Sequence, residues 1–279
     1  MSFRLLAVDL DGTLVDASGA VHAPDREAIA ALAAKGIPTT IITGRLFSGT
    51  RRIAIDVGTL GPVACVDGCH VVEAGSGTDL LHGSITAGGA ATLRELIGRH
   101  RLTTFVFAND QILYDEEGAS YLPYVRTWSL DHVLTERVTL HPHWEHARGI
   151  TALVALGTED AVRGMETDLQ RALGQTVYTA AFPVRRLERI GLWAIIVRAA
   201  GYSKGTALLW LAKHHGIKPE EIVAVGDWFN DVPMFEAAGR SFVMAQAPED
   251  VKQAATDRLN ADSSTGGGIA EAALLAGLL

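Results

Sequence analysis

Short apolar runs alternate with helical patterns in the first part of the chain and again near its end. Leu5–Val8 is a continuous apolar run, as expected for a strand that is buried on both faces. Pro24–Gly36 begins with proline and acidic residues and ends with lysine and glycine, which predicts a helix. Further strands are expected near residues 37–42, 63–66, 69–72, 221–225 and 241–245, and further helices near residues 46–57, 203–215 and 232–238. This alternation predicts an α/β fold built on a doubly wound parallel sheet.

The pattern changes between these two α/β stretches. After the Gly- and Ser-rich piece at residues 74–78, hairpin-like strands mix with helices instead of alternating with them. Strands are expected near residues 104–108, 111–114, 150–156, 176–182 and 192–197, and helices near residues 87–101 and 159–173. Mixed order of this kind predicts a separate, smaller α+β domain. We place it at residues 84–198, so the parallel-sheet domain consists of residues 1–83 and 199–279.

Composition narrows the class of protein. The chain has 279 residues, of which 48% are hydrophobic and 20% charged, which is typical of a globular protein with room for two domains. Its net charge of −8 argues against a nucleic-acid partner, since such proteins usually carry a basic face. No apolar run approaches the length of a membrane span, and no signal peptide is evident, so we expect a cytoplasmic protein. Cys65 and Cys69 are expected to be buried thiols, in keeping with a reducing compartment.

Polar side chains follow several of the predicted strands and begin one of the helices. They are Asp9 and Asp11, Thr43 with Gly44 and Arg45, Lys204, and Asp227 with Asn230 and Asp231. Because the carboxyl ends of parallel strands meet at one edge of a sheet, we expect these groups to lie close together. Carboxylates suit a hard cation, and lysine and threonine can hold phosphoryl oxygens. The sequence therefore predicts a site for magnesium and phosphate.

Four motifs stand in a fixed order: Asp9–Thr13, Thr43–Arg45, Lys204 and Gly226–Asp231, the last with the spacing GDxxND. This order resembles the haloacid dehalogenase-like (HAD) superfamily of aspartate-nucleophile phosphohydrolases, and in particular its Cof-like subgroup. The resemblance implies a Rossmann-like core with residues 84–198 as a cap over the site. It also implies an Mg²⁺-dependent phosphatase that hydrolyses a small phosphorylated metabolite, such as a sugar phosphate or a phosphorylated cofactor.

The resemblance also implies a role for each matching residue. Asp9 is expected to attack phosphorus and form an aspartyl-phosphate, and Asp11 to act as general acid and then as general base. The implied phosphate-binding residues are Thr43, Gly44, Lys204 and Asn230. The implied magnesium ligands are Asp9, Asp11 through its backbone carbonyl, Asp227 and Asp231, with Asp231 supporting either the metal or Lys204.

Two segments depart from the subgroup's pattern. Residues 244–247 read Met-Ala-Gln-Ala where members often have Met-Gly-Asn-Ala, and Asp67-Gly68 stands where Asn-Gly is common. Neither change removes a residue with an implied chemical role.

Other functions fit parts of the sequence. A phosphotransferase or phosphomutase on the same scaffold would pass the phosphoryl group to a second hydroxyl instead of water. A non-catalytic phospho-receiver, or a binding protein that kept the fold, would not need Asp11 as an acid. The substrate stays open, and so does the choice between monomer and homodimer.

Three further groups have no place in this scheme. His141, His143 and His146 could bind a transition metal, but solvated loop histidines are the favoured interpretation. Arg185, Arg186 and Arg189 could reach a second anionic group of a substrate, although a solvated charged surface is favoured. Trp228 and Phe229 could belong to the core or wall the pocket.

Overall fold

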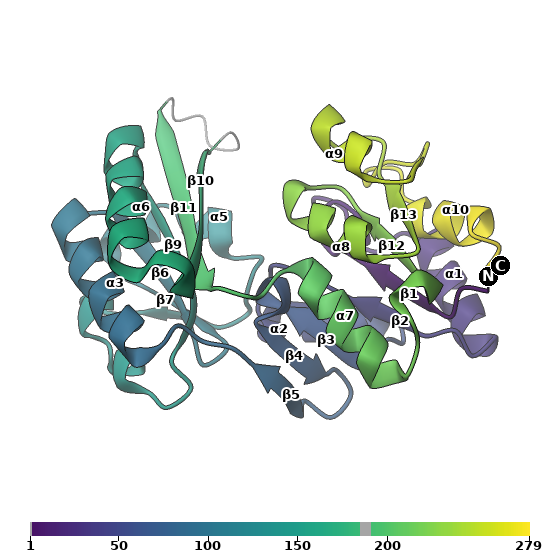
Figure 1. Ribbon diagram of the computed structural model, residues 1–279, viewed down its shortest axis with the longest axis horizontal. Helices are drawn as coiled ribbons and strands as arrows, with labels where there is room; N and C mark the ends of the chain where they lie inside the picture. Colours follow the sequence, from purple (N-terminus) through teal and green to yellow (C-terminus); the bar gives the residue numbers. More distant parts are fainter. Residues whose placement is uncertain (1, 185–190) are drawn as a thin grey trace. The chain divides into compact units, whose positions relative to one another are not determined.

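The computed structural model describes residues 2–184 and 191–279, which form two compact units (Figure 1). Unit 1 consists of Met1–Arg45, Thr50–Leu81 and Tyr202–Leu279, and unit 2 of Leu46–Gly49 and His82–Gly201.

Unit 1 is built on a five-stranded sheet with the strand order β14-β13-β12-β1-β2, in which every pair is parallel. Its strands are β1 (Leu5–Val8), β2 (Thr39–Ile41), β12 (Ile222–Gly226), β13 (Arg240–Val243) and β14 (Asp257–Arg258). All four residues of β1 are inaccessible to solvent, as its unbroken apolar run predicts. The predicted parallel α/β sheet is confirmed, although the sequence pattern did not reveal the two-residue strand β14.

Helices of unit 1 bury the sheet. They are α1 (Ala23–Ala34), α7 (Lys204–His215), α8 (Val232–Ala237), α9 (Glu249–Ala254) and α10 (Gly268–Leu275), together with the part of α2 (Phe47–Asp56) from Thr50 onward. Leu5 and Ala7 of β1 share a core with residues of α7 and α8. Leu6 and Val8 alternate to the opposite face and are equally buried. Both faces of the sheet are therefore covered, as in a doubly wound fold.

A second, three-stranded sheet in order β3-β4-β5 follows in the chain. It consists of β3 (Pro62–Cys65), β4 (His70–Glu73) and β5 (Asp79–His82). β3 and β4 are antiparallel and joined by a 3₁₀ turn at Val66–Gly68, so the strands expected near residues 63–66 and 69–72 form a hairpin. Cys65 and Cys69 are both fully buried, as predicted.

Unit 2 has one six-stranded sheet in order β10-β11-β9-β6-β7-β8, antiparallel except between β7 and β8. Its strands are β6 (Thr103–Ala108), β7 (Gln111–Tyr114), β8 (His132–Leu134), β9 (Ile150–Thr158), β10 (Val177–Pro183) and β11 (Leu192–Ala199). Its helices are α3 (Ala87–His100), α4 (Glu116–Ala119), α5 (Leu122–Val125) and α6 (Glu159–Leu173). α3 packs against α6, which contacts β9, β10 and β11 (Figure 1). The proposal that residues 84–198 act as a cap stays a prediction.

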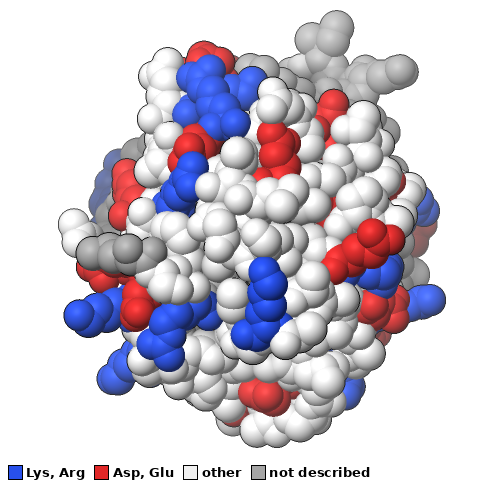
Figure 2. Space-filling model, turned by 90° about the vertical axis from the view of Figure 1, so that its right-hand side faces the viewer, with Lys and Arg blue, Asp and Glu red and all other residues white. Residues whose placement is uncertain are grey.

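The surface carries charges of both signs. On the face drawn in Figure 2, basic and acidic side chains are interspersed over a mostly uncharged area. Among the helices of the described residues, none combines the length and the apolar character needed to cross a bilayer.

Candidate active site

The register of the central sheet brings the first and last motifs together. Val8 of β1 pairs with Val225 of β12, and the N–H of Asp9 donates to the carbonyl of Val225 at 2.9 Å. Because the strands are parallel, both then end at the same edge. Asp9 follows β1 directly and Asp227 follows β12 directly, so the pairing of the two strands places both carboxylates at this edge.

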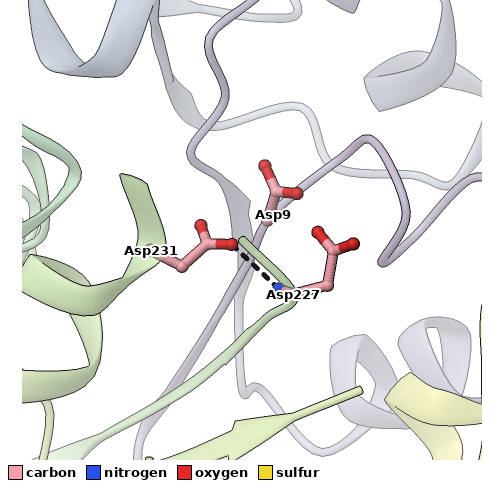
Figure 3. A group of neighbouring side chains, drawn as sticks. All are labelled: Asp9, Asp227 and Asp231. Carbon is pink, nitrogen blue, oxygen red and sulfur yellow. Dashed lines mark hydrogen bonds between the residues drawn. The ribbon is translucent and has the colours of Figure 1, made fainter. Parts of the chain in front are cut away.

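Three carboxylates gather there. Asp9, Asp227 and Asp231 each offer an oxygen atom, and these oxygens lie within 4.8 Å of one another (Figure 3). Asp231 comes from the 3₁₀ turn that follows β12. Its Oδ2 accepts the backbone N–H groups of Asp227 and Trp228, both at 2.9 Å. The Asp231 side chain therefore shapes the loop that carries Asp227.

Lys204 connects two of these carboxylates. Its Nζ donates to Asp9 Oδ1 at 2.5 Å and to Asp231 Oδ1 at 2.6 Å, and its side chain is 1% exposed. Lys204 is the first residue of α7, and a capping box between Ser203 and Thr206 fixes that end of the helix. The sequence predicts this lysine at the start of a helix, and from that position its ammonium group reaches the sheet edge.

The charges in this cluster do not balance. When all three carboxylates are ionised, the cluster carries more negative charge than the one buried ammonium group can offset. Burial, together with the neighbouring Asp231, raises the pKa of Asp227 to about 7, and burial also raises the pKa of Asp9. Burial would lower the pKa of Lys204, but the carboxylates of Asp231 and Asp9 raise it overall, so it stays charged. A cation is the usual remedy for such a surplus.

One carboxylate oxygen is placed to receive a cation. Asp227 Oδ1 is buried and accepts no hydrogen bond. Gly12, at a φ of +80°, passes so close that a Cβ atom there would lie 2.4 Å from Asp227 Oδ2, so only glycine brings the backbone of the Asp9–Thr13 motif this near. The three carboxylates offer only oxygen atoms as metal ligands, which fits a hard divalent cation such as magnesium.

The Asp11 carboxylate lies outside this three-carboxylate group. Arg45 binds it with two hydrogen bonds, Nε to Oδ2 at 2.8 Å and Nη2 to Oδ1 at 2.5 Å. The Arg45 side chain is buried, whereas the Asp11 side chain is 48% exposed. Arg45 was expected only to lie close to the other polar groups, and in this structure its guanidinium binds a carboxylate of the chain itself.

Gly44 of the second motif and Asn230 of the last motif, both predicted to bind phosphate, lie close together. Asn230 donates its Nδ2 to Asp67 Oδ1 at 2.9 Å, and Gly44 lies against both side chains. Thr43 is buried, and its Oγ1 accepts the N–H of Arg45 at 3.1 Å. The structure therefore connects Asp67, one of the two departures from the subgroup pattern, directly to Asn230.

Sequence reasoning missed one residue of this site. Gln246 donates its Nε2 to the carbonyl of Gly12 at 2.6 Å and to Asp227 Oδ2 at 3.2 Å. It belongs to the Met-Ala-Gln-Ala segment after β13, which the sequence marked only as a departure. A polar residue just after a parallel strand was the available signal, because that position faces the same sheet edge.

The sequence model of the haloacid dehalogenase-like hydrolases matches residues 6–272 of this chain. The chain belongs to this family. Among curated HAD relatives, the pyridoxal phosphate phosphatase YbhA of Escherichia coli (strain K12) is 26% identical over 265 residues, covering 90% of this chain and 91% of the relative. The 5-amino-6-(5-phospho-D-ribitylamino)uracil phosphatase YwtE of Bacillus subtilis (strain 168) is 26% identical over 278 residues, covering 91% of each.

A solved HAD-like hydrolase from Bacteroides thetaiotaomicron has the same fold. It superposes with a TM-score of 0.83 at 19% identity, covering 98% of this chain and all of that one. The predicted membership of the HAD superfamily and its Cof-like subgroup is thus confirmed. The chain is an enzyme of the phosphoric monoester hydrolase class.

The remaining residues that the sequence singled out are not part of the three-carboxylate cluster. Trp228 and Phe229 are 54% and 51% exposed, so they are not core residues of unit 1. His143 lies in the 3₁₀ turn Pro142–Glu145, His141 and His146 flank that turn, and the His143 ring makes an edge contact with each of the other two rings. Within residues 2–184 and 191–279, the three aspartates form the one group of acidic, histidine or cysteine side chains with metal-binding spacing. Arg185, Arg186 and Arg189 lie outside the described residues.

Proposed function

We propose that this HAD enzyme is a magnesium-dependent phosphatase that hydrolyses a small phosphorylated metabolite through an aspartyl-phosphate on Asp9. The observation that carries the proposal is the buried cluster at the sheet edge. Asp9 is held by Lys204 beside Asp227, whose Oδ1 accepts no hydrogen bond, and negative charge is in surplus. A phosphate dianion could enter this cluster only with a cation and the lysine to offset the charge.

In the proposed reaction, Asp9 and Asp11 share the chemistry. A carboxylate oxygen of Asp9 attacks phosphorus, and the bond from phosphorus to the ester oxygen breaks. Asp11 gives its proton to that leaving oxygen and so becomes a carboxylate. Asp11 then takes a proton from water as the water attacks phosphorus, which releases phosphate and regenerates the Asp9 carboxylate. Arg45 supports both roles by fixing the position of the Asp11 carboxyl group with two hydrogen bonds.

Asp9, the backbone carbonyl of Asp11 and Asp227 are proposed to hold the magnesium. When bound, the ion supplies positive charge that offsets the carboxylates and stabilises charge on the phosphoryl oxygens. Both oxygens of Asp231 already accept hydrogen bonds, from Lys204 and from the loop N–H groups. We therefore assign Asp231 first to positioning Lys204 and the loop.

The substrate class follows from the same site and from the relatives. Lys204, with Thr43, Gly44 and Asn230, is proposed to bind the phosphoryl oxygens. The two curated relatives are named for different substrates, and both substrates are phosphate monoesters of small molecules. Residues 84–198 are proposed to cover the site, exclude water and contact the part of the substrate beyond the phosphate.

Removing the metal tests the proposal most directly. Phosphate release from a panel of phosphorylated metabolites, measured without any added acceptor, should vanish in EDTA and return with excess magnesium. Release without an acceptor also separates hydrolysis from transfer to a second hydroxyl. Undiminished turnover by metal-free protein would contradict the site as proposed.

Stability should depend on pH in a way that magnesium changes. The pKa of Asp227 is about 7 in the folded protein and near 3.8 in an unfolded chain, so the metal-free folded state binds the extra proton between these values. The metal-free protein should therefore lose roughly 1 kcal/mol of stability per pH unit as pH rises through this range. Magnesium binds the ionised form, so its stabilising effect should grow with pH.

Melting temperatures in EDTA and in magnesium, at about pH 6 and about pH 8, would measure this effect. The Asp227→Asn variant is the control, because its side chain cannot take up the proton. An equal magnesium effect at both pH values would count against Asp227 as a ligand.

A further inference from the structure

Gln246 joins three segments that are far apart in the chain. Its Nε2 donates to the Gly12 carbonyl at 2.6 Å and to Asp227 Oδ2 at 3.2 Å. Its Oε1 accepts the N–H of Ser263 at 3.2 Å. One amide therefore spans the loop of the nucleophile, the loop of the proposed metal ligand, and the polar loop before α10.

This amide makes the two oxygens of Asp227 unequal. Oδ2 accepts the hydrogen bond from Gln246 and lies against Gly12, whereas Oδ1 is buried and accepts none. A carboxylate can rotate about its last bond, and a donor on one oxygen opposes that rotation. The other oxygen, Oδ1, then keeps its buried position without a hydrogen-bond partner.

We propose that Gln246 is a positioning residue that orients Asp227 and the Gly12 backbone so that Asp227 Oδ1 is presented to a divalent cation. This inference rests on the proposed function, because it assumes the magnesium site described above. Outer groups that orient metal-binding carboxylates are typically worth about 10- to 100-fold in metal affinity.

The backbone around Gln246 is held without its side chain. The N–H of Met244 donates to Gly226 at 3.1 Å, and the N–H of Ala245 donates to Ala261 at 3.0 Å. The Gln246 side chain itself is exposed. Loss of the amide should thus leave the loop in place and change the site alone.

The test compares Gln246→Met with Gln253→Met. Methionine keeps the length of the side chain and removes the amide, and Gln253 is an exposed glutamine in α9. Magnesium binding is measured by isothermal titration calorimetry without substrate, and the melting temperature is measured in EDTA. We expect the dissociation constant for magnesium to rise about 10- to 100-fold in Gln246→Met and to stay unchanged in Gln253→Met. The melting temperature in EDTA should be nearly the same in all three proteins.

Each other outcome has a distinct meaning. If the unsubstituted protein binds no magnesium, the proposed function fails. If it binds magnesium and Gln246→Met binds equally well, the positioning role is overturned and the metal site stands. A lower melting temperature in EDTA with an unchanged dissociation constant would likewise overturn it, because Gln246 would then only fasten loops together.

Discussion

Lys204→Met should abolish turnover and lower the stability of the metal-free protein by about 3–5 kcal/mol. Methionine has a similar length but removes the ammonium group that binds Asp9 and Asp231, which leaves buried carboxylates without their cation. The loss should be measured by urea unfolding in EDTA. Magnesium should restore part of the stability, because it brings positive charge to the same carboxylates, but it should not restore turnover.

Lys213→Met is the matched control for this prediction. Lys213 lies in the last turn of the same helix and is exposed, so its substitution should change stability by less than about 0.5 kcal/mol. If Lys204→Met unfolds at the same urea concentration as the unsubstituted protein, then Asp9 and Asp231 do not depend on the lysine for their charge balance.

Elements with a strong local pattern were predictable, and they carry most of the site. The unbroken apolar run of β1 predicts a strand buried on both faces. The polar residues that follow β1 and β12 predict the sheet edge at which these residues meet. Lys204 was predictable as a helix start because Ser203 precedes it as a capping residue. These features depend on neighbours in sequence, which is why a single sequence reveals them.

The contacts that sequence reasoning missed all join distant segments. Arg45 reaches Asp11 across 34 positions, and Gln246 reaches Gly12 across 234. No periodicity or capping signal records such a contact, because its geometry depends on how several loops pack at the sheet edge. The strand β14 was missed for a related reason. It has two residues, and it is a strand because it pairs with β13, not because it contains an apolar run.

Asp9→Asn should abolish both product release and the phosphoenzyme. The amide is a poor nucleophile, and no later step can proceed without the first. Asparagine matches aspartate in shape and keeps an oxygen that can accept the hydrogen bond from Lys204, so the variant should fold. Incubation with a phosphate-labelled substrate, followed by acid quenching, should leave no label on this protein.

Asp11→Asn should instead separate the two steps of the reaction. Proton transfer by a positioned side chain is worth about 10²–10⁴-fold, but p-nitrophenyl phosphate has an acidic leaving group that needs little of this help. Phosphoenzyme should therefore still form from this substrate, while its hydrolysis by water, which does not depend on the leaving group, becomes slow. Rapid mixing should show a burst of about one equivalent of nitrophenol per enzyme and then a slow phase. If Asp11→Asn gives neither burst nor label while Asp9→Asn gives both, the two roles are reversed.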